Sequence, residues 1–344
     1  MTVGKRIFKL AEKLWPIHRS ITGEGFRRSL ELIKSEIPEI KIHKIKSGAK
    51  VFDWTIPQEW KVNDAWIETP TGERICEYRK NNLHVLGYSI GIKKKVKKAE
   101  LIQHLHSIES MPEAIPYVTS YYKKNWGFCI SDKEKKKLVD GEYSVYIDAN
   151  HFDGFLNYGE ILIPGKSKRE IFLSTYLCHP SMANNELSGP CVTTFITKWL
   201  LKKKNNFSYR IIFIPETIGS IAYLSKNLST MKKNIIAGFN ITCIGDDRQY
   251  SIVLSRKENT LSDKVAQNVL NKIAKNYKIY SWRERGSDER QYCSPNVDLP
   301  VCTLMRTKFA EYPEYHSSFD TLNRVVNIKG LDGGFNFVKS CITM

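Results

Sequence analysis

The pattern that most constrains this chain is a repeated order in which an apolar run ends at a polar side chain just before a helix. Residues 171–177 read as a buried strand that stops at His179, and residues 188–204 carry apolar side chains at helical spacing. In α/β folds built from such units, ligands bind beyond the carboxyl ends of the strands. His179, with Asn185 and Glu186 behind it, is therefore expected at such an edge.

The same order recurs twice further along the chain. Residues 209–214 form an apolar run that ends before Glu216, and residues 301–305 form another that leads into a polar loop containing His316. Together with His179 and Glu186, these side chains are the parts of a hydrolytic zinc centre, which uses three protein ligands and keeps a position open for water. Zinc lowers the pKa of that water to about 7, and a nearby glutamate can carry its proton to the leaving group.

Further polar residues follow the other predicted strands or lie beside the proposed ligands. We expect them in the substrate pocket or around the ligands, and they are Asn185, Asp247, Asp288, Arg290, Tyr292 and Tyr315. Signatures of competing chemistries are absent from the sequence, including the HExxH helix, the GxSxG elbow, the Walker loop and the GxGxxG fingerprint.

The composition is that of a folded globular protein. Hydrophobic residues make up 42% of the 344 residues, and no apolar run approaches the roughly 20 residues that a membrane span needs. The N-terminal segment reads as an amphipathic helix rather than a signal peptide, so a cytoplasmic location is expected. Eight cysteines occur singly and without a CxxC pair, which indicates reduced, buried thiols.

The formal net charge is +17, with lysine runs at residues 93–98, 133–137 and 202–204. These runs lack interleaved aromatic residues, and no nucleic-acid-binding module accompanies them. We therefore expect a solvated basic surface and no specific nucleic-acid partner. Attraction of an acidic substrate or of an anionic membrane surface stays open.

Strands and helices alternate after about residue 140, which favours a three-layer α/β sandwich with a mixed, mostly parallel sheet. Short aromatic or alternating runs broken by turn signals occupy the region from about residue 42 to residue 92 and predict small antiparallel strands. We expect an α/β domain formed by residues 1–44 and 125–344, and a small β-rich inserted domain formed by residues 45–124.

The motifs resemble known families over nearly the whole chain. Their order is similar to that of the M28-type zinc aminopeptidases. More closely, four segments look like the bacterial DUF4910/DUF2172 aminopeptidase-like proteins: residues 14–25 (LWPIHRSITGEG), 54–60 (WTIPQEW), 178–189 (CHPSMANNELSG) and 215–220 (PETIGS). The resemblance implies a zinc-exopeptidase-like fold and the hydrolysis of amide or peptide bonds.

The departures from the two-zinc pattern concern charge. Asn185, Thr217 and Thr242 stand where the resemblance implies metal-binding carboxylates, and neutral side chains compensate a dication poorly. We therefore expect one zinc ion rather than two. In a set similar to the His/Glu/His arrangement of the zinc carboxypeptidases, His179, Glu186 and His316 would be the ligands and Glu216 the general base.

The leading hypothesis is a metal-dependent, aminopeptidase-like hydrolase that acts on a small peptide or another amide-containing substrate. An amidohydrolase acting on an acylated sugar in surface-polysaccharide metabolism would use the same chemistry. A non-catalytic descendant that binds a peptide or a glycan is the alternative from another class. Assembly into a homo-oligomer stays open.

Overall fold

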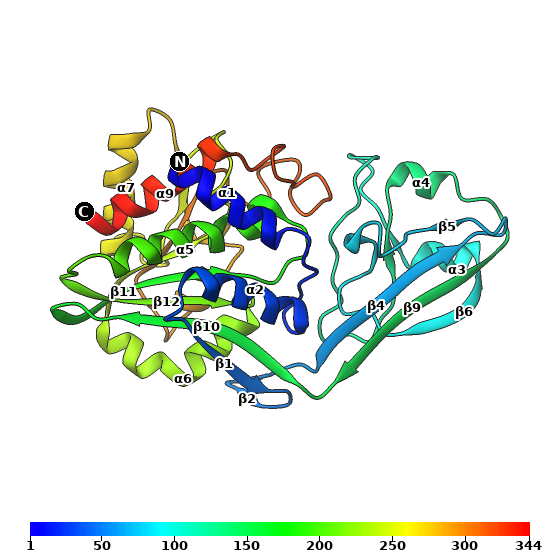
Figure 1. The fold of residues 1–344 in the computed structure, drawn as a ribbon, viewed down its shortest axis with the longest axis horizontal. Helices are drawn as coiled ribbons and strands as arrows, with labels where there is room; N and C mark the ends of the chain where they lie inside the picture. The colour runs from blue at the N-terminus through cyan, green and yellow to red at the C-terminus, as the bar shows by residue number, and fades with distance from the viewer.

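The computed structural model describes all 344 residues as two lobes that lie side by side (Figure 1). The larger lobe is an α/β sandwich around an eight-stranded mixed sheet, and α5 and α6 lie on opposite sides of this sheet. The predicted fold class is therefore confirmed. None of the helices combines the length and the apolar character that crossing a bilayer requires.

The four central strands of the large sheet are parallel, and antiparallel pairs flank them on both sides. The spatial order is β1 (Lys41–Lys46), β10 (Phe155–Ile163), β12 (Phe207–Ile214), β11 (Ser167–Tyr176), β13 (Ile235–Ile241), β16 (Val301–Met305), β14 (Ser251–Val253) and β15 (Lys278–Tyr280). The antiparallel pairs are β1–β10 and β10–β12 on one side and β16–β14 on the other. Because β12, β11, β13 and β16 are mutually parallel, the loops that follow them meet at one edge.

Seven helices belong to the large lobe. They are α1 (Val3–Leu14), α2 (Glu24–Glu36), α5 (Ser188–Leu201), α6 (Ile218–Asn234), α7 (Leu261–Ile273), α8 (Glu289–Tyr292) and α9 (Ile328–Thr343). Between β11 and α5 lies a short π-helical segment, Ala183–Leu187.

The smaller lobe is built on a four-stranded antiparallel sheet. Its elements are β4 (Glu59–Glu68), β5 (Arg74–Ile75), β6 (Ile92–Lys97), β7 (Leu105–His106), β8 (Phe128–Cys129), β9 (Glu142–Phe152), α3 (Lys98–Gln103) and α4 (Asp132–Lys136). This lobe reaches further along the chain than the range 45–124 expected for an inserted domain, because β9 pairs with β4 along its length. A two-strand hairpin, β2 (Lys50–Val51) and β3 (Trp54–Thr55), lies at the boundary between the lobes.

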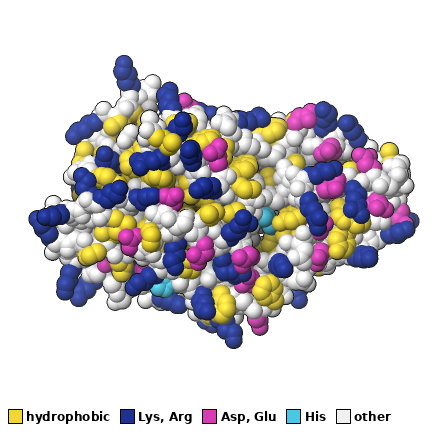
Figure 2. All heavy atoms as spheres, in the orientation of Figure 1, with side chains coloured by type: hydrophobic (Ala, Val, Ile, Leu, Met, Phe, Trp, Pro, Cys, Tyr) yellow, Lys and Arg dark blue, Asp and Glu magenta, His cyan; other side chains and the backbone are white.

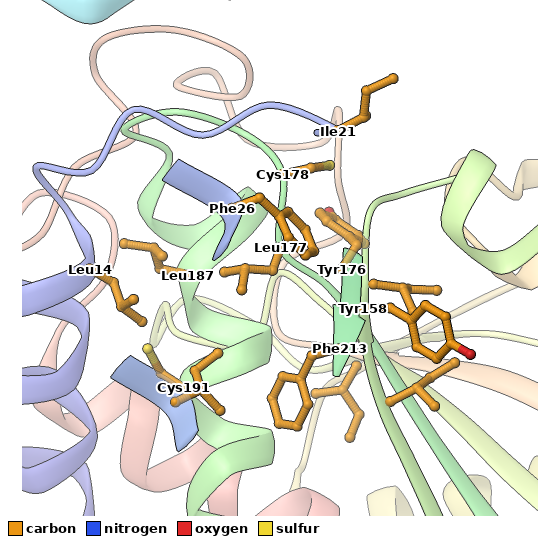
Figure 3. Packing of buried hydrophobic residues seen from close by; sticks show 14 of the residues in the cluster. Leu14, Ile21, Phe26, Tyr158, Tyr176, Leu177, Cys178, Leu187, Cys191 and Phe213 are labelled. Carbon is orange, nitrogen blue, oxygen red and sulfur yellow. The ribbon is translucent and has the colours of Figure 1, made fainter. Parts of the chain in front are cut away.

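The strand end that carries His179 is held in a close-packed core (Figure 3). Leu177 is fully buried in the same cluster as Phe26 of α2, Leu187 of the π-helical segment and Cys191 of α5. All eight cysteines are buried and unpaired, as expected for reduced thiols. Since core packing leaves little freedom for a side chain to shift, this arrangement fixes the position of the loop that follows β11.

Lysine and arginine side chains are spread over the visible face of both lobes and mixed with acidic ones (Figure 2). Several lysines of β6 form surface ion pairs, such as Lys94 with Glu100 and Lys95 with Glu142. Exposed pairs of this kind contribute little to stability. The basic runs of the sequence thus lie, at least in β6, on a solvated sheet edge.

Candidate metal centre

Three of the predicted site residues meet beyond the ends of neighbouring strands. His179 follows β11, Glu216 follows β12, and His316 lies on the loop after β16. The Nε2 atom of His179 is 3.7 Å from Oε2 of Glu216, and the ring centroids of His179 and His316 are 5.5 Å apart. His179 thus lies close to both Glu216 and His316 at the edge predicted from the sequence.

Glu186 lies on the other side of the His179 ring. Its Oε2 atom accepts a hydrogen bond from Nδ1 of His179 at 2.7 Å, whereas Nε2 is the nitrogen that faces Glu216. The sequence predicts Glu186 as a metal ligand together with His179 and His316. The geometry instead suits a carboxylate that orients the imidazole and fixes its tautomer.

The π-helical segment explains why Glu186 reaches Nδ1. The N–H of Leu187 donates to the carbonyl of Met182 at 3.3 Å, which closes a turn wider than an α-helical one. Asp320 accepts hydrogen bonds from the backbone N–H groups of Asn184 and Asn185, at 2.8 and 3.0 Å. Because Asp320 follows His316 on the same loop, this contact ties the two histidine loops together.

Arg19 is a fully buried partner of this pair. Its Nε donates to the backbone carbonyl of His179 at 3.1 Å and lies 3.8 Å from Oε1 of Glu186, while Nη1 donates to the carbonyl of Leu14. Burial raises the pKa of Glu186 to about 8, and the positive charge of Arg19 opposes that shift. From the sequence, Arg19 reads more simply as part of a charge cluster at the end of a helix.

A second metal ion would need further carboxylates, but the residues at two of the expected positions, Asn185 and Thr242, are neutral and hydrogen-bonded within the protein. The hydroxyl of Tyr176 donates to Oδ1 of Asn185 at 2.9 Å and accepts from Oγ1 of Thr242 at 2.6 Å. Two of the neutral residues identified in the sequence, Asn185 and Thr242, are therefore joined through Tyr176. Neither of them offers a negative charge to a second cation.

Glu216 is placed by a strained turn. Thr217 has φ 63° and ψ −75°, and the N–H of Ile218 donates to the carbonyl of Glu216 at 2.8 Å, which defines a rare γ-turn. Asp288 accepts hydrogen bonds from the N–H of Thr217 at 2.7 Å and from the hydroxyl of Ser220 at 2.9 Å. Strain of this kind is concentrated at functional sites, where neighbours hold it in place.

The remaining predicted residues divide into two groups. Tyr315 stacks on His316 with ring centroids 3.9 Å apart, and Arg290 lies close enough to oppose the raised pKa values of Glu216 and Asp288. Tyr292 instead bonds to Ser174 within the core, at 2.7 Å. Asp247 accepts from Asn327 and pairs with Lys329 at α9, so the structure does not bring it to the histidines.

The smaller lobe contributes a residue that sequence reasoning missed. The ring of Tyr117 lies 5.0 Å from that of His179 and 5.2 Å from that of His316, measured between centroids. Its N–H donates to the carbonyl of His316 at 2.8 Å, next to a bridge between Pro116 and Ser317. Since Tyr117 lies in the range assigned to the insertion, only a tertiary contact reveals it.

The donors at this point suit a zinc ion. Burial lowers the pKa of His179 and of His316 to about 3, so both imidazoles are neutral, and Nε2 of His316 is buried without a hydrogen-bond partner. Cys178, His179 and Glu186 also cluster, but there Nδ1 is engaged and burial raises the thiol pKa of Cys178. The Nε2 side, with Glu216, is the better match to a catalytic zinc site.

A cavity of about 200 Å³ opens onto His179 and Glu216. Residues of both lobes line it, namely Ile21, Trp54, Tyr121, Tyr122, Cys178, His179, Glu216, Thr217 and Ile218. Its largely apolar wall strengthens the interactions of the few charged groups that it contains.

The metal-free protein is expected to lose stability as the pH rises from about 6.5 to about 8. Burial raises the pKa of Glu216 to about 8 and that of Asp288 to about 7. Both groups then carry protons in the folded chain at pH values where the unfolded chain has released them, so each costs up to about 1.4 kcal/mol per pH unit as the pH rises. Urea denaturation in the presence of a chelator measures this slope. Glu216→Gln should reduce it, and stability that rises over this range would contradict the prediction.

Comparisons with known proteins agree with this fold. The family model of DUF4910, a domain of unknown function, matches residues 8–344. A protein of Clostridium acetobutylicum named for polysaccharide biosynthesis and an aminopeptidase-like domain is 44% identical over 319 residues, which cover 93% of this chain and 73% of the relative.

Solved structures extend the comparison. A crystal structure from Clostridium acetobutylicum, described as that of a peptidase, is 42% identical with a TM-score of 0.94 and covers 99% of this chain and 80% of its own. A zinc aminopeptidase from Bacillus subtilis has a TM-score of 0.69 at 14% identity, over 99% of this chain and 93% of that one, and shows the shared fold. The chain therefore belongs to the DUF4910 family, whose aminopeptidase-like fold it has.

Proposed function

We propose that this protein is a zinc-dependent hydrolase of amide bonds. The observation that carries the proposal is the position of His179, whose Nε2 atom lies 3.7 Å from Oε2 of Glu216 and whose ring centroid lies 5.5 Å from that of His316; His179 and Glu216 also line one cavity. His179 and His316 would hold the ion, which leaves two protein ligands where the sequence predicts three, and Glu186 would hold the His179 ring through Nδ1. This assignment replaces Glu186 as a ligand by Glu186 as an orienting group.

The residues of the chain have distinct tasks in this proposal. A zinc ion bound there would supply Lewis-acid polarisation of the scissile carbonyl and would acidify water. Glu216 would accept a proton from water at a carboxylate oxygen and deliver it to the leaving amine. Asp288 would hold the turn at Thr217 and thereby the direction of Glu216.

The substrate is proposed to be a small molecule with an amide bond. The aminopeptidase-like name of one relative supports a peptide, and the reference to polysaccharide biosynthesis in the same name supports an N-acylated sugar. A non-catalytic binder is the second candidate, and the neutral network of Asn185, Tyr176 and Thr242 favours it. A site with fewer carboxylates holds a dication less tightly.

Metal analysis and chelation test the proposal. Protein dialysed against zinc-containing buffer should bind about one zinc ion per chain, with far less in the His179→Ala and His316→Ala variants, because each removes a ligand. Hydrolysis of aminoacyl anilides and of N-acetylated amino sugars should stop on chelation and return with zinc. Turnover that survives chelation would contradict the proposal, and binding of less than about one tenth of an equivalent would favour the binder.

A further inference from the structure

We propose that a second cavity beside the candidate metal centre binds a neutral sugar ring of the substrate. This inference deepens the proposed function and rests on it. The cavity measures about 310 Å³, within the usual range for small-molecule sites. Its lining residues are Phe52, Asp53, Trp54, Ile221, Leu224, Leu228, Gln291, Ser294, Asn296 and Val297.

The two cavities share a wall. Trp54 lines this second cavity and also the one that contains His179 and Glu216. A substrate with its amide bond at Glu216 would therefore extend past the Trp54 ring into the second cavity. The β2–β3 hairpin that carries Trp54 lies near α6, at the lower edge of the large lobe in Figure 1.

The chemistry of the lining matches a sugar better than an apolar group. Leu224 and its neighbours on α6 give an alkyl surface, and Trp54 adds an aromatic one, which suit the C–H faces of a pyranose. Asp53, Gln291 and Asn296 offer carboxylate and amide groups, which can exchange hydrogen bonds with several hydroxyl groups. A purely apolar group would leave these polar side chains without partners.

The charges in the lining favour a neutral sugar. No lysine or arginine lines this cavity, and the carboxylate of Asp53 would repel an anion. A third cavity of about 580 Å³, on the other side of Tyr122, does contain Lys123 and Lys124. An acidic sugar would therefore favour that end, and a neutral one the end at Trp54.

The hairpin presents its aromatic residues at some conformational cost. Val51 pairs with Trp54, so Phe52 and Asp53 form a two-residue turn, a position that favours Asn and Gly. Phe52 nevertheless adopts φ 54°, which is rare for a bulky side chain, and remains 55% exposed. The strained backbone at Phe52 leaves its ring in solvent and so adds nothing to the packing of the core. Such strain is typical of ligand-binding sites.

Trp54 is braced from the smaller lobe. Its ring meets that of Tyr122 edge to face, with centroids 5.5 Å apart, and the Tyr122 hydroxyl donates to the carbonyl of Thr55 at 3.2 Å. Trp54 itself is 37% exposed. The ring is thus both accessible and held in place, as a stacking surface for a ligand requires.

Saturation-transfer NMR on the full-length, metal-free protein tests this inference. The probes are the methyl glycosides of glucose, galactose, mannose and N-acetylglucosamine, with methyl galacturonate glycoside as the anionic sugar and phenylalanine amide as the apolar group. We expect at least one neutral glycoside to bind. Trp54→Ala should weaken that binding at least about tenfold, whereas Trp54→Phe should retain most of it, because a phenyl ring keeps an aromatic face.

Trp66→Ala is the matched control, because Trp66 is a half-buried tryptophan that stacks on Tyr146 within the smaller lobe. No binding by any neutral glycoside, binding indifferent to Trp54→Ala, or stronger binding of the anionic or apolar probe would each overturn the inference. The measurement needs neither zinc nor turnover. If neutral glycosides bind in a Trp54-dependent way but the protein has no hydrolytic activity, this inference stands and the proposed hydrolase is rejected. If the protein is active but no neutral glycoside binds in a Trp54-dependent way, this inference alone is rejected.

Discussion

Replacing Glu216 by glutamine is expected to reduce turnover by about 100-fold to 10,000-fold, the contribution typical of a general acid or base. Glutamine keeps the shape of the side chain but cannot accept the proton of water. The Oε2 atom of Glu216 lies 3.7 Å from Nε2 of His179, the ring nitrogen that Glu186 does not engage. Zinc bound in zinc-containing buffer should stay near one equivalent in this variant, as measured by elemental analysis.

The matched control for this experiment is Glu311→Gln. Glu311 lies on the loop that leads to His316, but its carboxylate pairs with Lys278 at the surface, at 3.5 Å. This variant should keep both turnover and zinc. Loss of zinc together with turnover in Glu216→Gln would instead identify Glu216 as a third metal ligand, and full activity would remove it from the mechanism.

Replacing Arg19 by methionine is expected to lower the free energy of unfolding by about 2 to 5 kcal/mol, because it leaves two buried backbone carbonyls without hydrogen-bond donors. The side chains of Arg19 and Glu186 are both completely buried. Methionine fills much of the same space but offers neither a charge nor the donors that bind the carbonyls of His179 and Leu14. Urea denaturation at pH 7 measures the loss.

A double-mutant cycle separates the charge from the packing. Burial raises the pKa of Glu186 to about 8, so Glu186 is mostly neutral at pH 7 and the Arg19→Met/Glu186→Gln protein should recover little of the stability lost in Arg19→Met. Recovery of most of the lost stability would show that Glu186 is charged in the folded chain, and a loss below about 1 kcal/mol in Arg19→Met would contradict the prediction.

The sequence predicts the strand ends well because their signal is local. An apolar run that stops at His179 or at Glu216 is visible without any tertiary information, and parallel pairing then brings the two side chains together. The ligand role expected for Glu186 depends instead on the width of one turn. Counting positions along the sequence cannot distinguish a π-helical turn from an α-helical one. The sequence therefore predicts Glu186 as a metal ligand, whereas the structure places it at Nδ1 of His179.

Other parts of the site depend on contacts between distant segments. Arg19 reaches the carbonyl of His179 across 160 residues of sequence, and Tyr117 reaches the histidines from the smaller lobe. Neither contact leaves a periodic or local trace. The extent of the smaller lobe is obscured for a related reason, because residues 143–147 alternate like a strand of either sheet and only pairing with β4 assigns them.

The π-helical turn between β11 and α5 also bears on how such sites diverge. Removing one residue from Ala183–Leu187 would restore an α-helical turn and rotate the preceding residues by about 100° relative to α5. A different side chain would then stand behind His179 and set the basicity of its imidazole. A single-codon deletion, with no substitution at any metal-facing position, would be enough to change the chemistry of the centre.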